Sequence, residues 1–189
     1  WVFQKDVSGI GEMTNLSIGL RNKLSELAYI PRLSIADKRV SSDGTEKYLF
    51  ILPPFHPPLI KGGSGGVSED GNSIESVLIP DEDRLTLCIS TQVGCKLNCA
   101  FCLTGKGGFI RNLSHYEMIE QILAIRREIE YRLLRHSVPR NDTTASTVIA
   151  SQRRSNLSRM PEYYEDKKIT NVVLMGMGEP LDNYENVIK

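Results

Sequence analysis

Three of the four cysteines in this chain lie within nine residues, in the segment GCKLNCAFC, at Cys95, Cys99 and Cys102. Three thiolates at the spacing CxxxCxxC, separated by small or flexible residues, are typical of a loop that wraps around one metal centre. In a cluster of four iron atoms, three cysteines leave one iron without a protein ligand, and that iron is open to a substrate or cofactor. The spacing therefore predicts an iron–sulfur site.

Two other interpretations of these cysteines stay open. A structural zinc ion needs a fourth ligand, for which Cys88 and His115 are the candidates, although neither lies at a spacing typical of zinc sites. In the second interpretation, the thiols are ordinary buried side chains that bind no metal. This case is rarer than a zinc site, because such tight groups of cysteines are uncommon in cytosolic proteins. In a reducing compartment, clustered cysteines are more often metal ligands or redox catalysts than structural disulfides.

The composition indicates a soluble protein of ordinary domain size. The 189 residues are 40% hydrophobic and 24% charged, which suits one compact domain or one domain with a small appendage. The chain has no apolar run of about eighteen residues and no signal peptide, so we expect a cytoplasmic protein without a membrane partner. Basic and acidic residues number 23 each, so the overall basic excess typical of nucleic-acid binding is missing.

Charge is nevertheless uneven along the chain. Eight arginines but only three acidic residues lie between Arg126 and Arg159, which indicates either a solvated helix end and loop, the favoured interpretation, or a phosphate-contacting surface. The chain begins with Trp1 and ends at Lys189, inside what reads as the start of a helix. We therefore expect it to be part of a longer protein.

Hydrophobic periodicity predicts two helices, over residues 13–28 and 112–134. The first has leucines at helical spacing, with Thr14 or Asn15 as its N-cap. The second begins at a capping box, in which the Ser114 side chain and the Glu117 side chain three residues later satisfy each other's backbone amides. This second helix is the most strongly indicated element of the chain.

Alternation and β-branched residues predict strands, which are separated by two insertions. The strands lie at residues 47–52, 74–79 and 84–90 and at the beginning of 169–180, and the insertions cover residues 53–72 and 137–168. The second half thus reads strand, loop, helix, strand, loop, which is a βαβ unit with parallel strands. Ligands bind beyond the carboxyl ends of such strands, where both the cysteine loop and the segment GMGEP follow.

The segments TLCISTQVGCKLNCAFCLTGKGGFIRNLS and NVVLMGMGEPLDN closely resemble the radical S-adenosylmethionine (SAM) RNA methyltransferases that act on carbon 2 of adenine in large-subunit ribosomal RNA and in transfer RNA. WVFQKDVSGIGEMTNLSIGLRNKL resembles the accessory helical domain of that family, and DGTEKYLF resembles the strand that follows it. The resemblance implies an α/β fold, namely the N-terminal part of a radical SAM partial (β/α) barrel, preceded by a small helical accessory domain and a β-hairpin. The implied domains are a helical accessory domain over residues 1–45, a strand pair over 46–83 and the first βαβ unit of the radical SAM core over 84–189.

The resemblance also implies cofactors and their ligands. Cys95, Cys99 and Cys102 would hold a 4Fe–4S cluster whose open iron is chelated by the amino and carboxylate groups of SAM. Gly178 and Glu179, in the glycine-rich turn after the last strand, would contact SAM itself.

Two further residues have implied catalytic roles. Cys88 corresponds to the cysteine that resolves a covalent RNA–protein adduct, and Glu75 corresponds to the general base that takes a proton from the adenine. By residue type alone, Cys88 reads as a buried strand cysteine and Glu75 as the exposed side of an alternating strand. The methyl-carrying cysteine of the family lies far downstream, and the four cysteines here already have other roles. We therefore expect this chain alone not to methylate RNA.

The implied partners are large-subunit ribosomal RNA, transfer RNA and an electron donor such as flavodoxin or ferredoxin, and the implied state is a monomer. A disulfide bond is also implied. Lys106 and Arg111, which flank the glycines after the cysteines, are candidates for phosphate contacts and equally for ordinary surface charges. Two alternatives remain: a relative acting on a neighbouring adenine carbon, and a truncated, non-catalytic iron–sulfur or zinc module.

Overall fold

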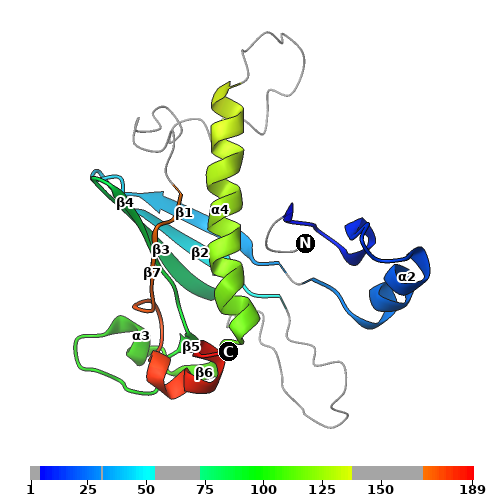
Figure 1. Cartoon of the computed structure of the whole chain (residues 1–189). Coiled ribbons are helices and arrows are strands. Elements are labelled where there is room, and N and C mark those ends of the chain that lie inside the picture. The colour runs from blue at the N-terminus through cyan, green and yellow to red at the C-terminus, as the bar shows by residue number, and fades with distance from the viewer. Residues whose placement is uncertain (1–4, 31, 54–72, 138–167) are drawn as a thin grey trace, which may run out of the picture.

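The computed structural model describes residues 5–30, 32–53, 73–137 and 168–189, without the side chains of residues 134–137. At its centre is a five-stranded sheet in the order β1-β2-β3-β4-β7, and one long helix, α4, lies across it (Figure 1). The strands are β1 (Ser34–Val40), β2 (Glu46–Ile51), β3 (Ser73–Asp81), β4 (Arg84–Cys88) and β7 (Asn171–Val173). This mixed arrangement agrees with the predicted α/β class.

The sheet is antiparallel from β1 to β4 and parallel between β4 and β7. In the parallel pair, Cys88 lies opposite Val173. The chain reaches β7 from β4 by way of α4 (His115–Ser137), so the predicted βαβ unit with parallel strands is confirmed. The capping box at the start of α4 is confirmed too: the Ser114 amide donates to Glu117 Oε2 at 2.9 Å, and the Glu117 amide donates to Ser114 Oγ at 3.3 Å.

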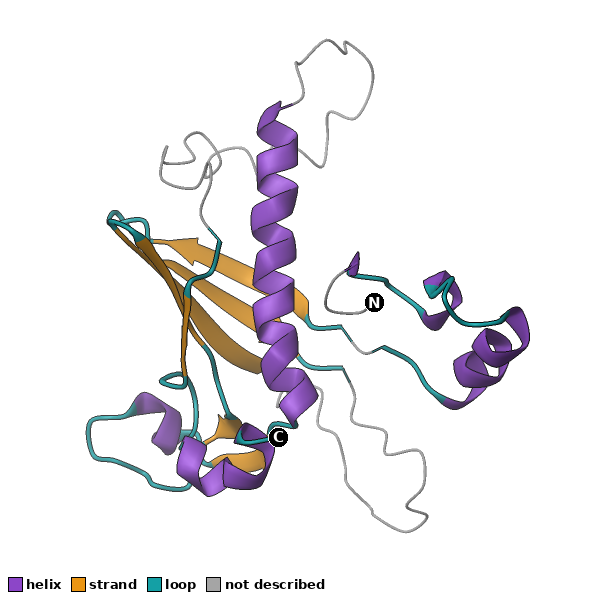
Figure 2. Ribbon diagram, in the orientation of Figure 1, coloured by secondary structure: helices purple, strands orange, loops and turns teal. Residues whose placement is uncertain are grey.

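The hydrophobic core lies between α4 and the sheet face that it covers (Figure 2). Ile74 and Leu78, on one face of β3, are fully buried, and Ile125 and Ile129 of α4 belong to the same cluster. Each fully buried aliphatic side chain of this kind stabilises the fold by about 1.5–3 kcal/mol. The periodicity of α4 and the alternation of β3 therefore meet in one core.

The opposite face of the sheet carries the intervening residues of β3 and β4. Val77 pairs with Cys88, and Glu75 lies two residues before Val77, so all three side chains share this face. In Figure 2 the described helices leave this face uncovered. Glu75 and Cys88 therefore lie on neighbouring strands, on the side away from α4.

Strand β1 was not expected from the sequence, and it falls within the range predicted to be a helical domain. Its central residues Asp37, Lys38 and Arg39 are charged, and most of the strand is exposed, because β1 is the edge of the sheet. Charges are typical of edge strands, where they hinder pairing with other chains. They also remove the apolar alternation from which a strand is normally predicted.

The helix expected over residues 13–28 is present as α2 (Ile18–Leu27), but its predicted N-cap is wrong. Ser17 is the cap, and its Oγ accepts a hydrogen bond from the Leu20 amide at 3.3 Å. A short 3-10 helix, η1 (Ile10–Glu12), comes first and occupies part of the chain before Thr14. No residue of α2 is buried.

Several short elements gather beyond the carboxyl ends of β4 and β7 (Figure 1). They are β5 (Gln92–Gly94), α3 (Leu103–Lys106), β6 (Phe109–Asn112), η3 (Pro180–Asn183) and α5 (Tyr184–Val187). Strands β5 and β6 pair antiparallel as a separate two-stranded sheet. Neither was expected from the sequence, because each has only three or four residues.

The two expected insertions lie outside the described residues, apart from their ends. Of the arginine-rich segment, Arg126, Arg127 and Arg132 have described side chains, and each has an acidic partner within 4 Å. These three arginines are therefore paired with acidic side chains of the chain itself, Arg132 in a buried position, and the other five lie outside the described side chains. Within the described residues, no helix is both long and apolar enough to cross a membrane.

Candidate functional site

The cysteine loop is closed at its base by the β5–β6 pair. The Cys95 amide donates to the Gly108 carbonyl at 3.0 Å. Gly94 has a φ of 74°, and a Cβ at this position would lie 1.8 Å from the same carbonyl oxygen. Only glycine combines this left-handed conformation with so close an approach of two backbones. The glycine before the first cysteine and the glycines after the last one thus bring the two ends of the loop together.

Within the loop, α3 folds back onto the segment between the first two cysteines. Asn98 adopts a positive φ of 45°, and a Cβ on Gly105 would lie 2.8 Å from the Asn98 Cα. Asparagine is one of the residue types that tolerate this left-handed conformation. The residues between the cysteines are therefore held in a compact turn.

The three thiols differ in exposure and in acidity. Cys95 is 9% exposed, Cys102 is partly exposed and Cys99 is exposed. Cys102 is the N-cap of α3, and the backbone amides of Gly105 and Thr104 beside its thiol hold the pKa of that thiol below the usual value. The pKa is lowered because these amides stabilise the thiolate, which is the form that binds metal.

The donor set fits an iron–sulfur cluster in its chemistry, since three thiols, one of them acidified, share a single eight-residue stretch from Cys95 to Cys102. The conformation does not gather them. Among the described residues, no three cysteine, histidine, aspartate or glutamate side chains lie close enough together to hold a metal ion. This holds equally for zinc sites completed by Cys88 or His115. All four cysteines are free thiols, so the implied disulfide stays a prediction.

The glycine-rich turn after β7 packs directly on the segment that leads into the cysteine loop. The Gly176 amide donates to the Ile89 carbonyl at 3.0 Å, and the Thr91 amide donates to the Met177 carbonyl at 2.9 Å. A Cβ on Gly176 would lie 2.7 Å from the Ile89 carbonyl carbon, so this approach requires glycine. The expected meeting of the two motifs at one edge of the sheet is therefore confirmed.

Glu179 lies at the end of this turn, where it begins η3. Its carboxylate Oε1 accepts a hydrogen bond from the Leu181 amide at 3.1 Å, and its own amide donates to Gln92 Oε1 at 3.0 Å. Gly178 precedes it with a φ of 97°. The two residues expected to contact SAM thus lie against β5, the strand that ends immediately before Cys95.

Cys88 is at the carboxyl end of β4, and it is 8% exposed. Burial raises the pKa of its thiol, and a smaller opposing effect comes from the Met175 backbone amide. The thiol form is therefore favoured in this conformation, which matches the ordinary properties of a buried strand cysteine. Its expected catalytic role stays a prediction.

Glu75 shares the uncovered face with Cys88, and its carboxylate is paired. Lys47 Nζ on β2 lies 2.6 Å from Glu75 Oε1, with about two fifths of each side chain exposed. The Glu75 carbonyl accepts a hydrogen bond from Ser90 Oγ at 2.6 Å, which ties this part of β3 to the segment after β4. The structure therefore places the expected base and the expected resolving cysteine on one surface.

The two basic candidates for phosphate contacts differ in their surroundings. Lys106, in α3, is exposed. The Arg111 guanidinium makes two hydrogen bonds to the Glu117 carboxylate, at 2.7 and 2.9 Å, beside the capping box. Arg111 thus supports the start of α4. For Lys106, a phosphate contact and an ordinary surface charge both remain open.

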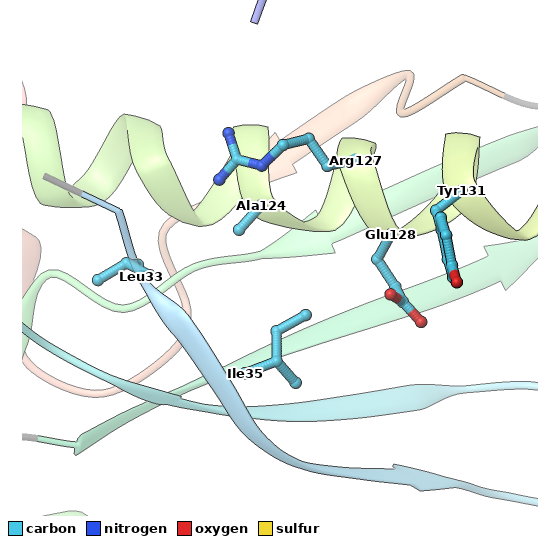
Figure 3. Close-up of a pocket in the computed structure, with 6 residues that line it drawn as sticks. All are labelled: Leu33, Ile35, Ala124, Arg127, Glu128 and Tyr131. Carbon is cyan, nitrogen blue, oxygen red and sulfur yellow. The ribbon is translucent and has the colours of Figure 1, made fainter. Parts of the chain in front are cut away.

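A pocket of about 260 Å³ lies elsewhere, between β1 and α4 (Figure 3). Its lining residues are Leu33, Ile35, Ala124, Arg127, Glu128 and Tyr131. None of the expected site residues belongs to it, so it is separate from the cysteine loop.

Buried amide side chains hold the segment that leads into the cysteine loop, and sequence reasoning missed them. Gln92, Gln121 and Asn183 are at most 2% exposed. Asn183 Nδ2 donates to the carbonyls of Thr91 and Leu113 at 2.7 and 2.8 Å, and Gln121 accepts a hydrogen bond from the Ser90 amide at 2.9 Å. An isolated amide residue beside a loop has no sequence signal that distinguishes it from a surface residue.

Comparison with known proteins shows which family the chain resembles. Residues 1–30 match the family model for the ribosomal RNA large subunit methyltransferase N-terminal domain. Over 188 residues, the whole chain is 42% identical to the dual-specificity RNA methyltransferase RlmN of Pelobacter propionicus, of which it covers 39%. It is also 42% identical over 190 residues to the probable dual-specificity RNA methyltransferase RlmN of Thermotoga maritima, of which it covers 40%.

The fold agrees with these matches. The structure is similar, with a TM-score of 0.62 and 30% sequence identity, to the crystal structure of a radical SAM methyltransferase from Sphaerobacter thermophilus, and the match covers 100% of this chain and 41% of that one. The chain thus spans about two fifths of the length of the relatives that it matches. On these matches, the chain is similar along its whole length to part of the RlmN RNA methyltransferases.

Proposed function

We propose that this chain is the cluster-binding and SAM-binding part of a radical SAM methyltransferase that methylates carbon 2 of adenine in large-subunit ribosomal RNA and in transfer RNA. The observation that carries the proposal is the direct packing of the Gly176–Glu179 turn on the segment leading into the cysteine loop, at the carboxyl ends of two parallel strands. That edge is where α/β folds bind their ligands. The names of the relatives support the RNA substrate class.

Cys95, Cys99 and Cys102 would hold the 4Fe–4S cluster, and Gly178 and Glu179 would contact SAM. When bound, these groups supply one-electron chemistry at the edge of the sheet. The Cys102 thiol, acidified by the amides of α3, is prepared for ligation. Since the described conformation does not gather the three thiols, cluster assembly would have to rearrange the exposed part of the loop around Cys99.

Glu75 and Cys88 would act on the RNA side of the reaction. Glu75 would take a proton from the adenine and Cys88 would release the covalent RNA–protein adduct, and both lie on the sheet face away from α4. The methyl-carrying cysteine would lie in the part of the relatives that this chain does not span. An electron donor such as flavodoxin or ferredoxin, a cytoplasmic location and a monomeric state complete the proposal.

The fold details belong to the same proposal. The parallel β4–β7 pair with α4 between its strands would be the first unit of a partial (β/α) barrel, and the uncovered sheet face would be the barrel's interior. Residues 1–45 would form the accessory domain, extended by β1 into the sheet.

The test is cofactor chemistry on the chain itself. After anaerobic reconstitution with iron and sulfide and reduction with dithionite, the chain should give the EPR signal of a reduced 4Fe–4S cluster, and SAM should change that signal. The Cys95→Ala, Cys99→Ala and Cys102→Ala variants should lose iron, while Cys88→Ala should keep it. A colourless chain that binds zinc instead would contradict the proposed enzyme and support the alternative, a non-catalytic metal-binding module.

A further inference from the structure

Gln92 connects three separate segments of the site through one side chain. It is fully buried at the start of β5. Its Oε1 accepts a hydrogen bond from the Glu179 amide at 3.0 Å, while its Nε2 donates to Asn112 Oδ1 at 2.8 Å and to Asp182 Oδ2 at 2.7 Å. The segments that meet here are the strand entering the cysteine loop, the strand leaving it, and the glycine-rich turn with η3.

The chemistry of these bonds requires an amide. One carbonyl oxygen accepts from a backbone N–H, and both hydrogens of the NH₂ group go to oxygen acceptors, so every polar atom of the side chain has a partner. A glutamate at position 92 would keep the acceptor, lose both donors and place a second carboxylate beside Asp182. A leucine would remove the acceptor of the part-buried Glu179 amide and a donor from both Asn112 and Asp182, of which Asp182 keeps Lys96. Losing these bonds destabilises the contact because it leaves polar groups without partners they had.

Asp182 extends the connection to the cysteine loop from a second side. Lys96 Nζ lies 2.9 Å from Asp182 Oδ2 and 4.6 Å from the centroid of the Phe109 ring. Lys96 is the residue immediately after Cys95. The hydrogen bonds from Lys96 and Gln92 also hold the pKa of Asp182 below its usual value, so the bridging group is a carboxylate. Asp182 therefore binds residues on both sides of Cys95.

The turn and Gln92 are also in close steric contact. A Cβ on Gly178 would lie 2.5 Å from the Gln92 Cβ and 2.8 Å from its backbone nitrogen. The turn therefore lies directly on Gln92, and the hydrogen bond to the Glu179 amide follows one residue later.

We propose that Gln92 is a positioning residue: through its bonds to Glu179 and Asp182, it holds the turn that would contact SAM at a constant place relative to Cys95. This inference rests on the proposed function. It predicts that loss of the Gln92 amide spares the cluster and weakens the response to SAM, because the three cysteines are untouched while the turn loses its tie to β5.

The experiment titrates SAM into the reduced, reconstituted chain and records the SAM concentration at half of the EPR change, together with iron content and the thermal unfolding midpoint. Gln92→Leu and the near-isosteric Gln92→Glu should keep wild-type iron content and need at least about tenfold more SAM, as expected for a loss of about 1.4 kcal/mol. Asp182→Asn, which removes the charge facing Lys96 but keeps an acceptor for Gln92, should have a smaller effect of the same sign.

Tyr48→Phe is the control for general destabilisation. It removes a buried hydroxyl that donates a hydrogen bond to Glu46. Tyr48 is on β2, two strands away from β4. This variant should lower the unfolding midpoint without changing the SAM response. If it shifts the SAM response as much as the Gln92 variants at a comparable midpoint, Gln92 acts through stability alone and the inference fails.

The remaining outcomes separate this inference from the proposed function. A wild-type chain that responds to SAM, together with Gln92 variants that respond at the same concentration, overturns the positioning role alone. Gln92→Glu losing its iron would assign Gln92 to the folding of the cysteine loop and would likewise overturn it. A wild-type chain without a cluster, or with a cluster that ignores SAM, overturns the proposed function and the inference that rests on it.

Discussion

Gly178 and Gln92 are in direct contact, so close that a Cβ on Gly178 would lie 2.5 Å from the Gln92 Cβ. Gly178 also has a φ of 97°, which side chains rarely adopt. The turn and the strand that enters the cysteine loop therefore touch at a point with room for a hydrogen atom and nothing larger.

The first prediction follows from this contact. Gly178→Ala should lower the free energy of unfolding by about 1–3 kcal/mol and weaken the EPR response to SAM, because the turn must move away from β5. Gly107→Ala is the matched control, since its φ is −75° and its Cβ would lie 3.5 Å from the Thr104 carbonyl oxygen. Urea unfolding of both variants checks the difference, and equal costs would contradict the steric argument.

Two glycines at the base of the cysteine loop provide a second comparison. Gly94 and Gly108 both have a positive φ, 74° and 76°, but a Cβ on Gly94 would lie 1.8 Å from a backbone oxygen and a Cβ on Gly108 would meet nothing within 4 Å. Gly108→Ala should cost about 1–2 kcal/mol through conformation alone. Gly94→Ala should cost more than about 3 kcal/mol and reduce iron uptake, because β5 and β6 can no longer close the loop. Denaturant unfolding and iron analysis would show the order, and a reversed order would refute it.

The capping box gives a pH dependence with a defined sign. Burial alone would raise the pKa of Glu117, but the hydrogen bonds from Arg111 and Ser114 outweigh it and hold this pKa below its ordinary value. A carboxylate with a depressed pKa in the folded state contributes stability that is complete above the unfolded value and is lost as the pH falls through the folded value.

Between neutral pH and about pH 3, the wild-type chain should therefore lose more stability on acidification than Glu117→Gln does, with the extra loss confined to pH values below about 4.5. Urea unfolding at a series of pH values measures both curves. Parallel curves would show that Glu117 contributes no pH-dependent stability.

Two ion pairs formed by arginines of α4 show how burial changes the contribution of an ion pair to stability. Arg132 lies 2.7 Å from Glu46, with side-chain exposures of 8% and 4%, whereas Arg126 lies 3.6 Å from Glu130, with exposures of 36% and 59%. Arg132→Met should cost about 3–5 kcal/mol, because it leaves the Glu46 carboxylate buried without its main partner. Arg126→Met should cost less than about 1 kcal/mol, because solvent already screens its pair. Similar costs in chemical denaturation would contradict this difference.

A final prediction separates the RNA side of the proposed reaction from the cofactor side. Glu75 lies on β3, on the sheet face away from α4 and outside both the cysteine loop and the turn. Glu75→Gln should therefore leave the iron content and the EPR response to SAM unchanged. A loss of either would remove Glu75 from the RNA side and assign it to the cofactor site.

Periodicity made the larger elements predictable. The apolar spacing and capping box of α4, and the alternation in β2, β3 and β4, are confirmed within a few residues. Strand β1 escaped prediction because its exposed edge carries charges instead of alternating apolar residues. Strands β5 and β6 escaped because each has three or four residues, too few for a period.

The residue types and spacings by themselves determined that three thiols share one loop, that a glycine-rich turn ends in Glu179, and that both follow strands of a parallel unit. Only the tertiary structure decided that Arg111 supports a capping box and that Gln92 binds Glu179, a residue 87 positions further along the chain. The reason is physical. The place of a strand end depends on the local pattern of side chains, whereas the partner of a buried amide depends on the register of β4 against β7 and on how closely two backbones pack.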